Sequence, residues 1–170
     1  MAGTAILSHG LNSSPDATKV TAMAEVARSR GWAEVRPDFS DLDESGRLVD
    51  IDHRIQRLCE HIDAASGPVV LAGSSMGSFA AGFASLERKV AGLFLLVPPI
   101  VIDGYARTFA AADVPTTVIH AWGDDLIPAQ DVVRWAQARR SRLVLVDDGH
   151  RLAGHVQFCA EEFGRFLDAL

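Results

Sequence analysis

Short apolar segments alternate with amphipathic helical patterns along the whole chain. The segment "GPVVLAG" (67–73) is continuously apolar, which is typical of a strand buried on both faces. Similar strand patterns occupy residues 4–9, 32–39, 89–99, 115–123 and 141–150, and helical patterns occupy 14–31, 47–65, 77–87, 103–112, 128–140 and 155–170. Strands that alternate with helices predict a parallel sheet of about six strands, covered by helices on both faces in a three-layer α/β/α arrangement.

Local signals refine these boundaries. Ser14 is expected to cap the first helix with Pro15 at its first position, and "SDLDESG" (40–46) is expected to be a polar loop. The helix predicted at 47–65 presents one apolar face, made of Leu48, Ile51, Ile55, Leu58 and Ile62. In parallel sheets of this kind, ligands bind at the carboxyl ends of the strands. Residues that follow the predicted strands are therefore the candidates for function.

Length and composition favour a globular protein. A chain of 170 residues is expected to form one domain over 1–170, and its 48% hydrophobic and 22% charged residues are ordinary for such a domain. The net charge of −6 disfavours nucleic acids and anionic membranes as partners, because both require a cationic surface. The basic cluster Arg139, Arg140 and Arg142 is interpreted as the solvated end of a helix.

The cysteines and the chain start give expectations about environment. Cys59 and Cys159 are far apart and form no C-x-x-C pair, so free thiols are expected rather than a disulfide or a metal site. No histidine cluster has metal-ligand spacing. The first residues carry no signal-peptide pattern, and no apolar run is long enough for a membrane helix. A cytoplasmic location is expected.

Ser75 stands at the centre of the motif Gly73-Ser74-Ser75-Met76-Gly77, which matches G-x-S-x-G. The motif lies between a predicted strand and a predicted helix, the setting in which it forms a nucleophile elbow. A phosphate-binding turn is the alternative, but the lysine of a P-loop is missing. Ser75 is the predicted catalytic nucleophile.

A serine nucleophile requires a base, and the base requires an acid. His150 follows the last predicted strand and is the expected base; His155 is a weaker alternative. Asp124 and Asp125 follow the preceding strand and cannot be separated on physical grounds, and Asp103 is a third possibility. The order Ser, Asp, His is the one that this strand arrangement uses.

Two backbone amides are needed to stabilise an oxyanion. The Met76 amide, directly after the nucleophile, and the Leu11 amide, in the loop after the first strand, are the expected donors. His9 is expected either to hold that loop by hydrogen bonds or to be a satisfied histidine at a strand end, and His120 is expected to pack at another strand end.

Three motifs together resemble the small, lidless α/β-hydrolases, close to the YqiA-like bacterial serine esterases. They are "GSSMGS" (73–78), "HAWGDDLIP" (120–128) and "DDGHRL" (147–152), and the loop "HGLNSSP" (9–15) after the first strand is similar as well. The resemblance covers nearly the whole chain and selects Asp124, which stands four residues after His120 and four before Pro128. It implies a minimal α/β-hydrolase fold that lacks the first two strands and any cap domain.

The expected function is hydrolysis of small carboxylic esters through an acyl-enzyme on Ser75, with no metal or organic cofactor. A thioesterase or peptidase with the same triad is an alternative, and so is a non-catalytic binding protein. Without a lid the pocket should be shallow and should favour small acyl groups. A deeper wall could come from a homodimer or from a set of apolar residues, Phe79, Tyr105, Phe109, Trp122 and Leu126.

Overall fold

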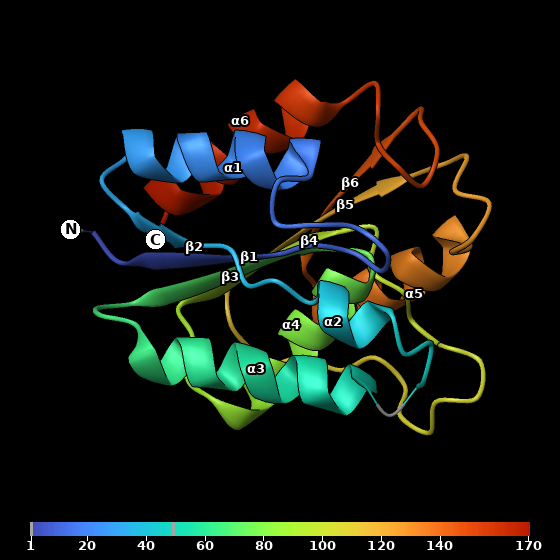
Figure 1. Cartoon of the computed structure of the whole chain (residues 1–170). Coiled ribbons are helices and arrows are strands. Elements are labelled where there is room, and N and C mark those ends of the chain that lie inside the picture. Colours follow the sequence, from blue (N-terminus) through green and yellow to red (C-terminus); the bar gives the residue numbers. More distant parts are fainter. Residues whose placement is uncertain (1, 49) are drawn as a thin grey trace.

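A computed structural model describes residues 2–48 and 50–170 and contains one six-stranded sheet (Figure 1). All its neighbouring strands are parallel, and their order is β2-β1-β3-β4-β5-β6. The strands are β1 (Thr4–Ser8), β2 (Ala33–Val35), β3 (Val69–Ser74), β4 (Gly92–Leu96), β5 (Thr116–Ala121) and β6 (Arg142–Val146). The predicted parallel sheet of about six strands is confirmed.

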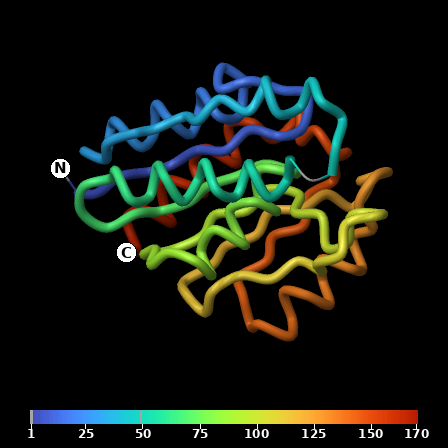
Figure 2. The backbone as a smooth tube through the Cα atoms, turned by 60° about the horizontal axis from the view of Figure 1, so that its bottom comes forward, coloured from blue at the N-terminus to red at the C-terminus, as the bar shows by residue number. Residues whose placement is uncertain are grey.

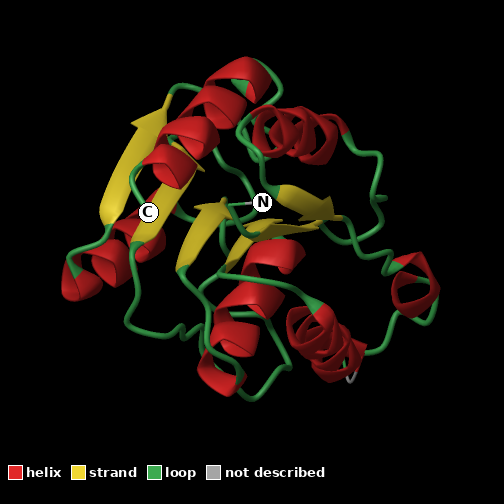
Figure 3. Ribbon diagram, turned by 90° about the vertical axis from the view of Figure 1, so that its left-hand side faces the viewer, coloured by secondary structure: helices red, strands yellow, loops and turns green. Residues whose placement is uncertain are grey.

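Helices cover both faces of the sheet, as Figures 1 and 3 show. One face carries α1 (Thr18–Ser29) and α6 (Val156–Asp168), and the other carries α3 (Asp50–Ala64), α4 (Met76–Glu87) and α5 (Ala129–Arg139). A short helix, α2 (Ser40–Asp43), lies in the connection between β2 and α3. The three-layer arrangement is therefore confirmed.

Each face of the sheet has its own apolar core. Phe94 of β4 packs between Phe163 and Phe166 of α6, with ring centroids 5.1 and 5.7 Å apart. On the opposite face, Phe79 contacts Phe83 and stacks on Phe109. These side chains are buried, so the two cores fix the sheet between its helix layers.

Both cysteines are free and buried, one in each core. Burial raises the pKa of the Cys59 and Cys159 thiols to about 11, because a thiolate loses its hydration there. The expectation of two free thiols is confirmed.

The first helix begins later than predicted, at Thr18 instead of Ser14. The Ser14 hydroxyl accepts from the Asp16 amide at 3.3 Å and the Ser14 carbonyl accepts from the Ala17 amide at 3.1 Å. These bonds form a separate turn before the helix. The side chain of Ser14 stabilises that turn and does not cap α1.

The predicted polar loop at 40–46 contains helix α2. The Asp38 carboxylate accepts from the Ser40 amide at 2.9 Å and from the Ser40 hydroxyl at 2.5 Å, which stabilises the start of this turn of helix. Arg57 of α3 binds the Asp41 carboxylate through both of its terminal nitrogens, at 2.7 and 2.9 Å. Contacts with α3 thus stabilise a helix that the local sequence does not favour.

The helix predicted from Arg47 begins at Asp50. Arg47 and Leu48 precede it, and Leu48 is 42% exposed instead of lying on the buried face. Residue 49 falls in the predicted helix but outside the described residues. The Asp50 carboxylate binds His53 Nδ1 at 2.8 Å, across the first turn of α3.

The helix predicted at 103–112 is absent from this fully described segment. The Phe109 amide donates to the Ile100 carbonyl, and the Ala112 amide donates to the Ser85 hydroxyl, both at 2.9 Å. Arg139 donates to the Ala111 and Ala112 carbonyls. The backbone of this segment is therefore satisfied by tertiary contacts. Arg139 is a structural residue and not merely part of a solvated helix end.

Loops that follow the strands gather at one edge of the sheet, on the right-hand side of Figure 1. Figure 2 shows the N-terminus and the C-terminus together on the left, away from these loops. Within residues 2–48 and 50–170, no helix has both the length and the apolar character needed to cross a membrane.

Candidate active site

Ser75 occupies a strained turn between β3 and α4. Its backbone has φ 53° and ψ −118°, a conformation that residues other than glycine rarely adopt. The Ser75 amide donates to the Leu96 carbonyl of β4 at 2.9 Å, which fixes the turn to the next strand. The serine side chain is left partly exposed at the edge of the sheet.

The two glycines of the motif make the turn possible because neighbouring backbone atoms leave no room for a Cβ at either position. A Cβ on Gly73 would lie 2.4 Å from the Gly77 carbonyl carbon, and a Cβ on Gly77 would lie 2.1 Å from the Ser8 carbonyl oxygen. No side chain fits at either position. Ser78 adds a buried hydroxyl that lies 2.7 Å from the Gly73 carbonyl and 2.9 Å from the Leu96 carbonyl.

His150 lies in the loop after β6 and reaches the serine. Its Nε2 is 3.0 Å from Ser75 Oγ, and its Nδ1 is 2.8 Å from Asp124 Oδ2. A neutral imidazole with its proton on Nδ1 donates to Asp124 and accepts from the Ser75 hydroxyl. Ser75, His150 and Asp124 thus form one continuous line of hydrogen bonds.

The Asp124 side chain is fully buried, whereas that of His150 is 17% exposed. Asp124 Oδ1 accepts from the Leu126 and Ile127 amides at 2.9 and 2.8 Å, so the carboxylate is oriented by its own loop. Asp125 and Asp103 are exposed and make no hydrogen bond through their side chains to other described residues. The structure therefore brings Asp124, and neither alternative, to the histidine.

His155, the weaker alternative base, lies at the start of α6 and binds Asp148 instead of Ser75. Its Nδ1 is 2.8 Å from Asp148 Oδ2, which also accepts from the Gly154 amide at 3.0 Å. Asp148 Oδ1 accepts from the Gly149 amide at 2.7 Å. His155 thus helps to brace the loop that carries His150.

Leu11 and Met76, the predicted oxyanion donors, line one cavity, whose lining does not include Ser75 itself. The preceding residue, Gly10, is close enough that an added Cβ would lie 3.6 Å from the Ser75 Cβ. Met76 is the first residue of α4, so its amide has no partner within the helix. The Leu11 amide has no acceptor among the residues that the structure describes.

The loop after β1 is held on both sides of Leu11 by a buried ion pair. Arg54 Nη1 donates to the His9 carbonyl at 2.8 Å, and Arg54 Nη2 binds the Asp43 carboxylate. The other oxygen of Asp43 accepts from the Asn12 amide at 2.9 Å. The side chains of Arg54 and Asp43 are only 2% and 6% exposed.

The His9 side chain also holds the loop after β1. Its Nδ1 donates to the Gly10 carbonyl at 2.7 Å, and its Nε2 accepts from the Phe39 amide at 3.0 Å. Burial lowers the pKa of His9, which keeps the ring neutral and able to make both bonds. Of the two possibilities for His9, the geometry matches the loop-holding one. His120 packs at its strand end as expected and binds the Ile127 carbonyl at 3.1 Å.

Arg54 and Asp43 were not identified from the sequence. Arg54 falls on the predicted apolar face of α3, between Ile51 and Ile55, where a charged residue is unexpected. That position is the available signal, because a charge on a buried face requires a partner. Its partner Asp43 lies in the segment that was predicted to be a loop.

A cavity of about 140 Å³ opens beside Leu11 and Met76. Its other wall comes from the end of α2 and the start of α3. The apolar wall considered from the sequence is not formed. Phe79 and Phe109 are buried in the core, while Trp122 and Leu126 are exposed. Within residues 2–48 and 50–170, no group of three or more His, Cys, Asp or Glu side chains could hold a metal ion.

Comparison with known proteins gives the family. A protein from Xanthomonas campestris pv. campestris, named as a hydrolase of the alpha/beta superfamily, is 53% identical; the match covers 99% of both chains with a TM-score of 0.95. The chain belongs to the alpha/beta hydrolase superfamily. No family model and no curated protein matches this alpha/beta hydrolase.

More distant structures share the alpha/beta hydrolase fold. A YdeN-like hydrolase from Pectobacterium atrosepticum is 24% identical, with a TM-score of 0.68 over 96% of this chain and 91% of that one. A serine hydrolase without a lid from Xanthomonas campestris is 19% identical, with a TM-score of 0.75 over 98% of this chain and 81% of that one. In this alpha/beta hydrolase, β4 and β5 are joined by residues 97–115, which contain no helix or strand.

The buried ion pair leads to a stability prediction with a matched control. Asp43→Asn leaves the buried Arg54 guanidinium without its counter-charge and should lower the free energy of unfolding by about 3–5 kcal/mol. Asp41→Asn removes the exposed pair with Arg57, which joins the same two helices, and should leave stability nearly unchanged. Urea unfolding followed by circular dichroism measures both variants. Equal losses in the two variants would contradict the assignment.

Proposed function

We propose that the protein is a serine hydrolase that cleaves small carboxylic esters through an acyl-enzyme on Ser75. The observation that carries this proposal is the hydrogen-bonded line from Ser75 through His150 to Asp124, with distances of 3.0 and 2.8 Å. A nucleophile, a base and an acid in this order convert a weak hydroxyl into a nucleophile. Placement of Ser75 on an elbow at the carboxyl edge of a parallel sheet adds support.

In the first half of the reaction, Ser75 Oγ attacks the ester carbonyl carbon while His150 Nε2 takes the hydroxyl proton. The carbonyl oxygen becomes an oxyanion in a tetrahedral intermediate. His150 then donates its proton to the alcohol oxygen, the bond from carbon to that oxygen breaks, and the alcohol leaves. The products of this half are the free alcohol and an ester between the acyl group and Ser75.

In the second half, His150 takes a proton from water as the water oxygen attacks the acyl carbon. The second tetrahedral intermediate collapses, His150 returns the proton to Ser75 Oγ, and the carboxylic acid leaves. Asp124 keeps the Nδ1 proton of His150 in place and stabilises the imidazolium in both halves. Because side chains, backbone amides and water carry every step, this mechanism uses no metal or organic cofactor.

The oxyanion is assigned to the Leu11 and Met76 amides, with the α4 N-terminus favouring negative charge. Donors of this kind act best when they are fixed before the reaction begins. The ion pair of Arg54 and Asp43 binds the backbone on both sides of Leu11, so these are positioning residues for that amide.

Within the superfamily, we place the chain near the YqiA-like esterases on the strength of its three motifs and the short 97–115 connection. A thioester or amide could react at the same triad, since only the leaving group differs. A binding protein without activity would not require the serine, histidine and aspartate to be aligned. A small-molecule ester as the partner and the cytoplasm as the location remain proposals.

The nucleophile is tested by Ser75→Ala. This variant should lose p-nitrophenyl acetate hydrolysis by at least roughly 10³-fold, because the members of a triad act as a unit. Initial rates at matched protein concentration, with folding checked by circular dichroism, give the comparison with wild type. Retention of activity within tenfold of wild type would remove Ser75 from the mechanism.

The acid is tested by comparing neighbouring aspartates. Asp124→Asn should lower kcat by roughly 10³–10⁴-fold, because the amide no longer fixes the His150 tautomer. Asp125→Asn, at the exposed neighbouring position, should remain close to wild type. Steady-state kinetics of both variants on one ester decide between them. A larger loss for Asp125→Asn would reverse the assignment.

A further inference from the structure

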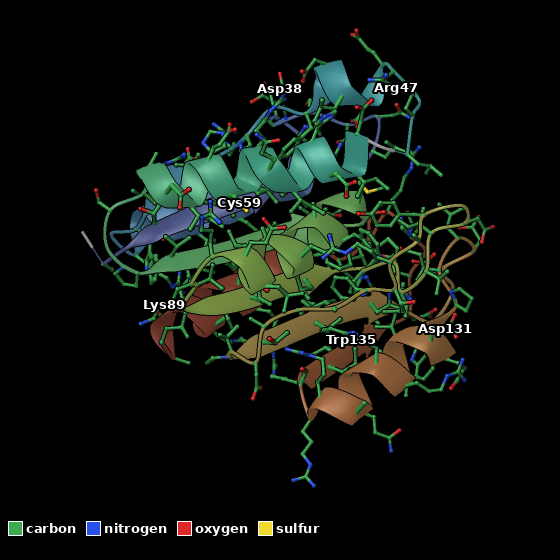
Figure 4. The ribbon with its side chains drawn as sticks, turned by 90° about the horizontal axis from the view of Figure 1, so that it is seen from below. Asp38, Arg47, Cys59, Lys89, Asp131 and Trp135 are labelled. Carbon is green, nitrogen blue, oxygen red and sulfur yellow. The ribbon has the colours of Figure 1, made fainter. Side chains whose placement is uncertain are left out.

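The residues that line the cavity show on which side of the proposed triad it lies. Two of its lining residues, Leu11 and Met76, carry the amides assigned to the oxyanion. The rest of its lining comes from α2, α3 and the residues described between them, together with one residue of the loop after β1: Asn12, Leu42, Asp43, Gly46, Arg47, Leu48, Asp50, Ile51 and Arg54. In Figure 4, Arg47 marks this region, next to α2 and the start of α3. The lining includes neither Ser75 nor any residue of the loops that carry Asp124 and His150, so the cavity meets the proposed triad only through its neighbours Leu11 and Met76.

The position of the cavity indicates whether it faces the acyl group or the alcohol of a bound ester. The tetrahedral carbon bears Ser75 Oγ, the oxyanion, the leaving alcohol and the acyl substituent. The alcohol oxygen must approach His150 Nε2 to receive its proton, so the alcohol lies on the histidine side. The acyl substituent points in the remaining direction. A cavity lined by the two residues that carry the assigned oxyanion amides, and by none of the histidine loop, is on the acyl side.

The cavity is lined by apolar side chains and by charged side chains that pair with one another. Its apolar side chains are Leu11, Leu42, Leu48, Ile51 and Met76. Its charges neutralise one another, because Arg54 binds Asp43 and Arg47 lies 3.3 Å from Asp50. Asp50 also binds Ser45 and His53. No charge is left to recognise an ionised acyl group, which favours an uncharged one.

Volume limits the size of that group. The cavity measures about 140 Å³, and an apolar cavity of about 150 Å³ in another protein accommodates one benzene ring. A chain of about six carbons is of comparable size. Longer chains must leave the cavity and extend into water, where further CH₂ groups add little to binding.

We propose that this cavity is the acyl-binding subsite and that it takes uncharged, apolar acyl groups of up to about six carbons. The inference rests on the proposed esterase function and gives it a substrate class. It gives the expected preference for small acyl groups a cavity with a named lining. Its apolar wall opposite Leu11 and Met76 comes from Leu42 of α2, Leu48, and Ile51 of α3.

A series of p-nitrophenyl esters from acetate to decanoate tests the subsite. In wild type, kcat/KM should rise from acetate to a maximum at about four to six acyl carbons. Each CH₂ that enters the cavity should contribute at most roughly fourfold. Octanoate and decanoate should fall below the maximum. A maximum at eight carbons or more would overturn the size limit.

Leu48→Trp and Val101→Trp form a matched pair of variants. Leu48 lines the cavity and is half exposed, so a larger ring can enter the cavity without disrupting the core. Val101 is 64% exposed on the loop after β4, at the same edge of the sheet, and does not line the cavity. The ratio of kcat/KM for hexanoate to that for acetate is unaffected by the fraction of folded enzyme. It should fall at least roughly tenfold in Leu48→Trp and stay within about twofold in Val101→Trp.

Other outcomes separate the two proposals. If wild type hydrolyses every ester no faster than Ser75→Ala, the proposed esterase function fails and the subsite fails with it. If wild type is active but Leu48→Trp lowers hexanoate and acetate equally, only the subsite is wrong. An equal fall of the ratio in Val101→Trp would also reject the subsite and leave the triad untouched.

Discussion

The backbone contact between Gly77 and the end of β1 is the constraint on which the rest of the site depends. A Cβ on Gly77 would lie 2.1 Å from the Ser8 carbonyl oxygen, so helix α4 approaches the sheet as closely as backbone atoms allow. That approach leaves too little chain between β3 and α4 for an ordinary turn. Ser75 consequently adopts φ 53°, and its hydroxyl is presented at the edge where the loops after β1, β5 and β6 meet. The same contact sets the loop after β1 against the turn, and this places Leu11 and Met76 on one cavity.

Asp124, Arg54 and His9 are buried polar side chains near this turn, and each is held in one orientation by its hydrogen bonds. Asp124 is fully buried, yet it accepts two amides of its own loop in addition to His150. Arg54 would be costly as a lone buried charge, and its pairing with Asp43 makes it a clamp on the backbone around Leu11. Burial lowers the pKa of His9 and keeps its ring neutral, and the ring donates a hydrogen bond to the Gly10 carbonyl. A rigid site is the result, and transition-state stabilisation by fixed donors requires rigidity.

Local patterns in the sequence predict the sheet and predict that Ser75, His150 and an aspartate meet at its edge. The choice of Asp124 among the aspartates comes from the resemblance to known hydrolases. Alternating strand and helix segments specify a parallel sheet, and residues after its strands must converge at one edge. Features set by tertiary contacts were missed. Helix α2 begins with bonds to Asp38 and contacts α3. The segment 103–112 is irregular because Arg139 and Ser85 bind its backbone, and Ser14 stabilises a turn before α1. The sequence suggests an acyl wall that includes Phe79, Phe109, Trp122 and Leu126, but the first two are buried in the core and the last two are exposed. The proposed acyl cavity is lined instead by residues of α2 and α3, the two helices that the pairing of Arg54 with Asp43 joins.

The central claim is that Ser75 is an activated nucleophile because of its place in this turn. Reaction of the native protein with a fluorophosphonate, followed by peptide mass spectrometry, tests it most directly, since the serine oxygen displaces fluoride and leaves a stable phosphonyl adduct. One adduct is expected, on Ser75, and labelling should be abolished when the protein is unfolded in urea before the reagent is added. Absence of an adduct on the folded protein, or an adduct on any other serine, would contradict it.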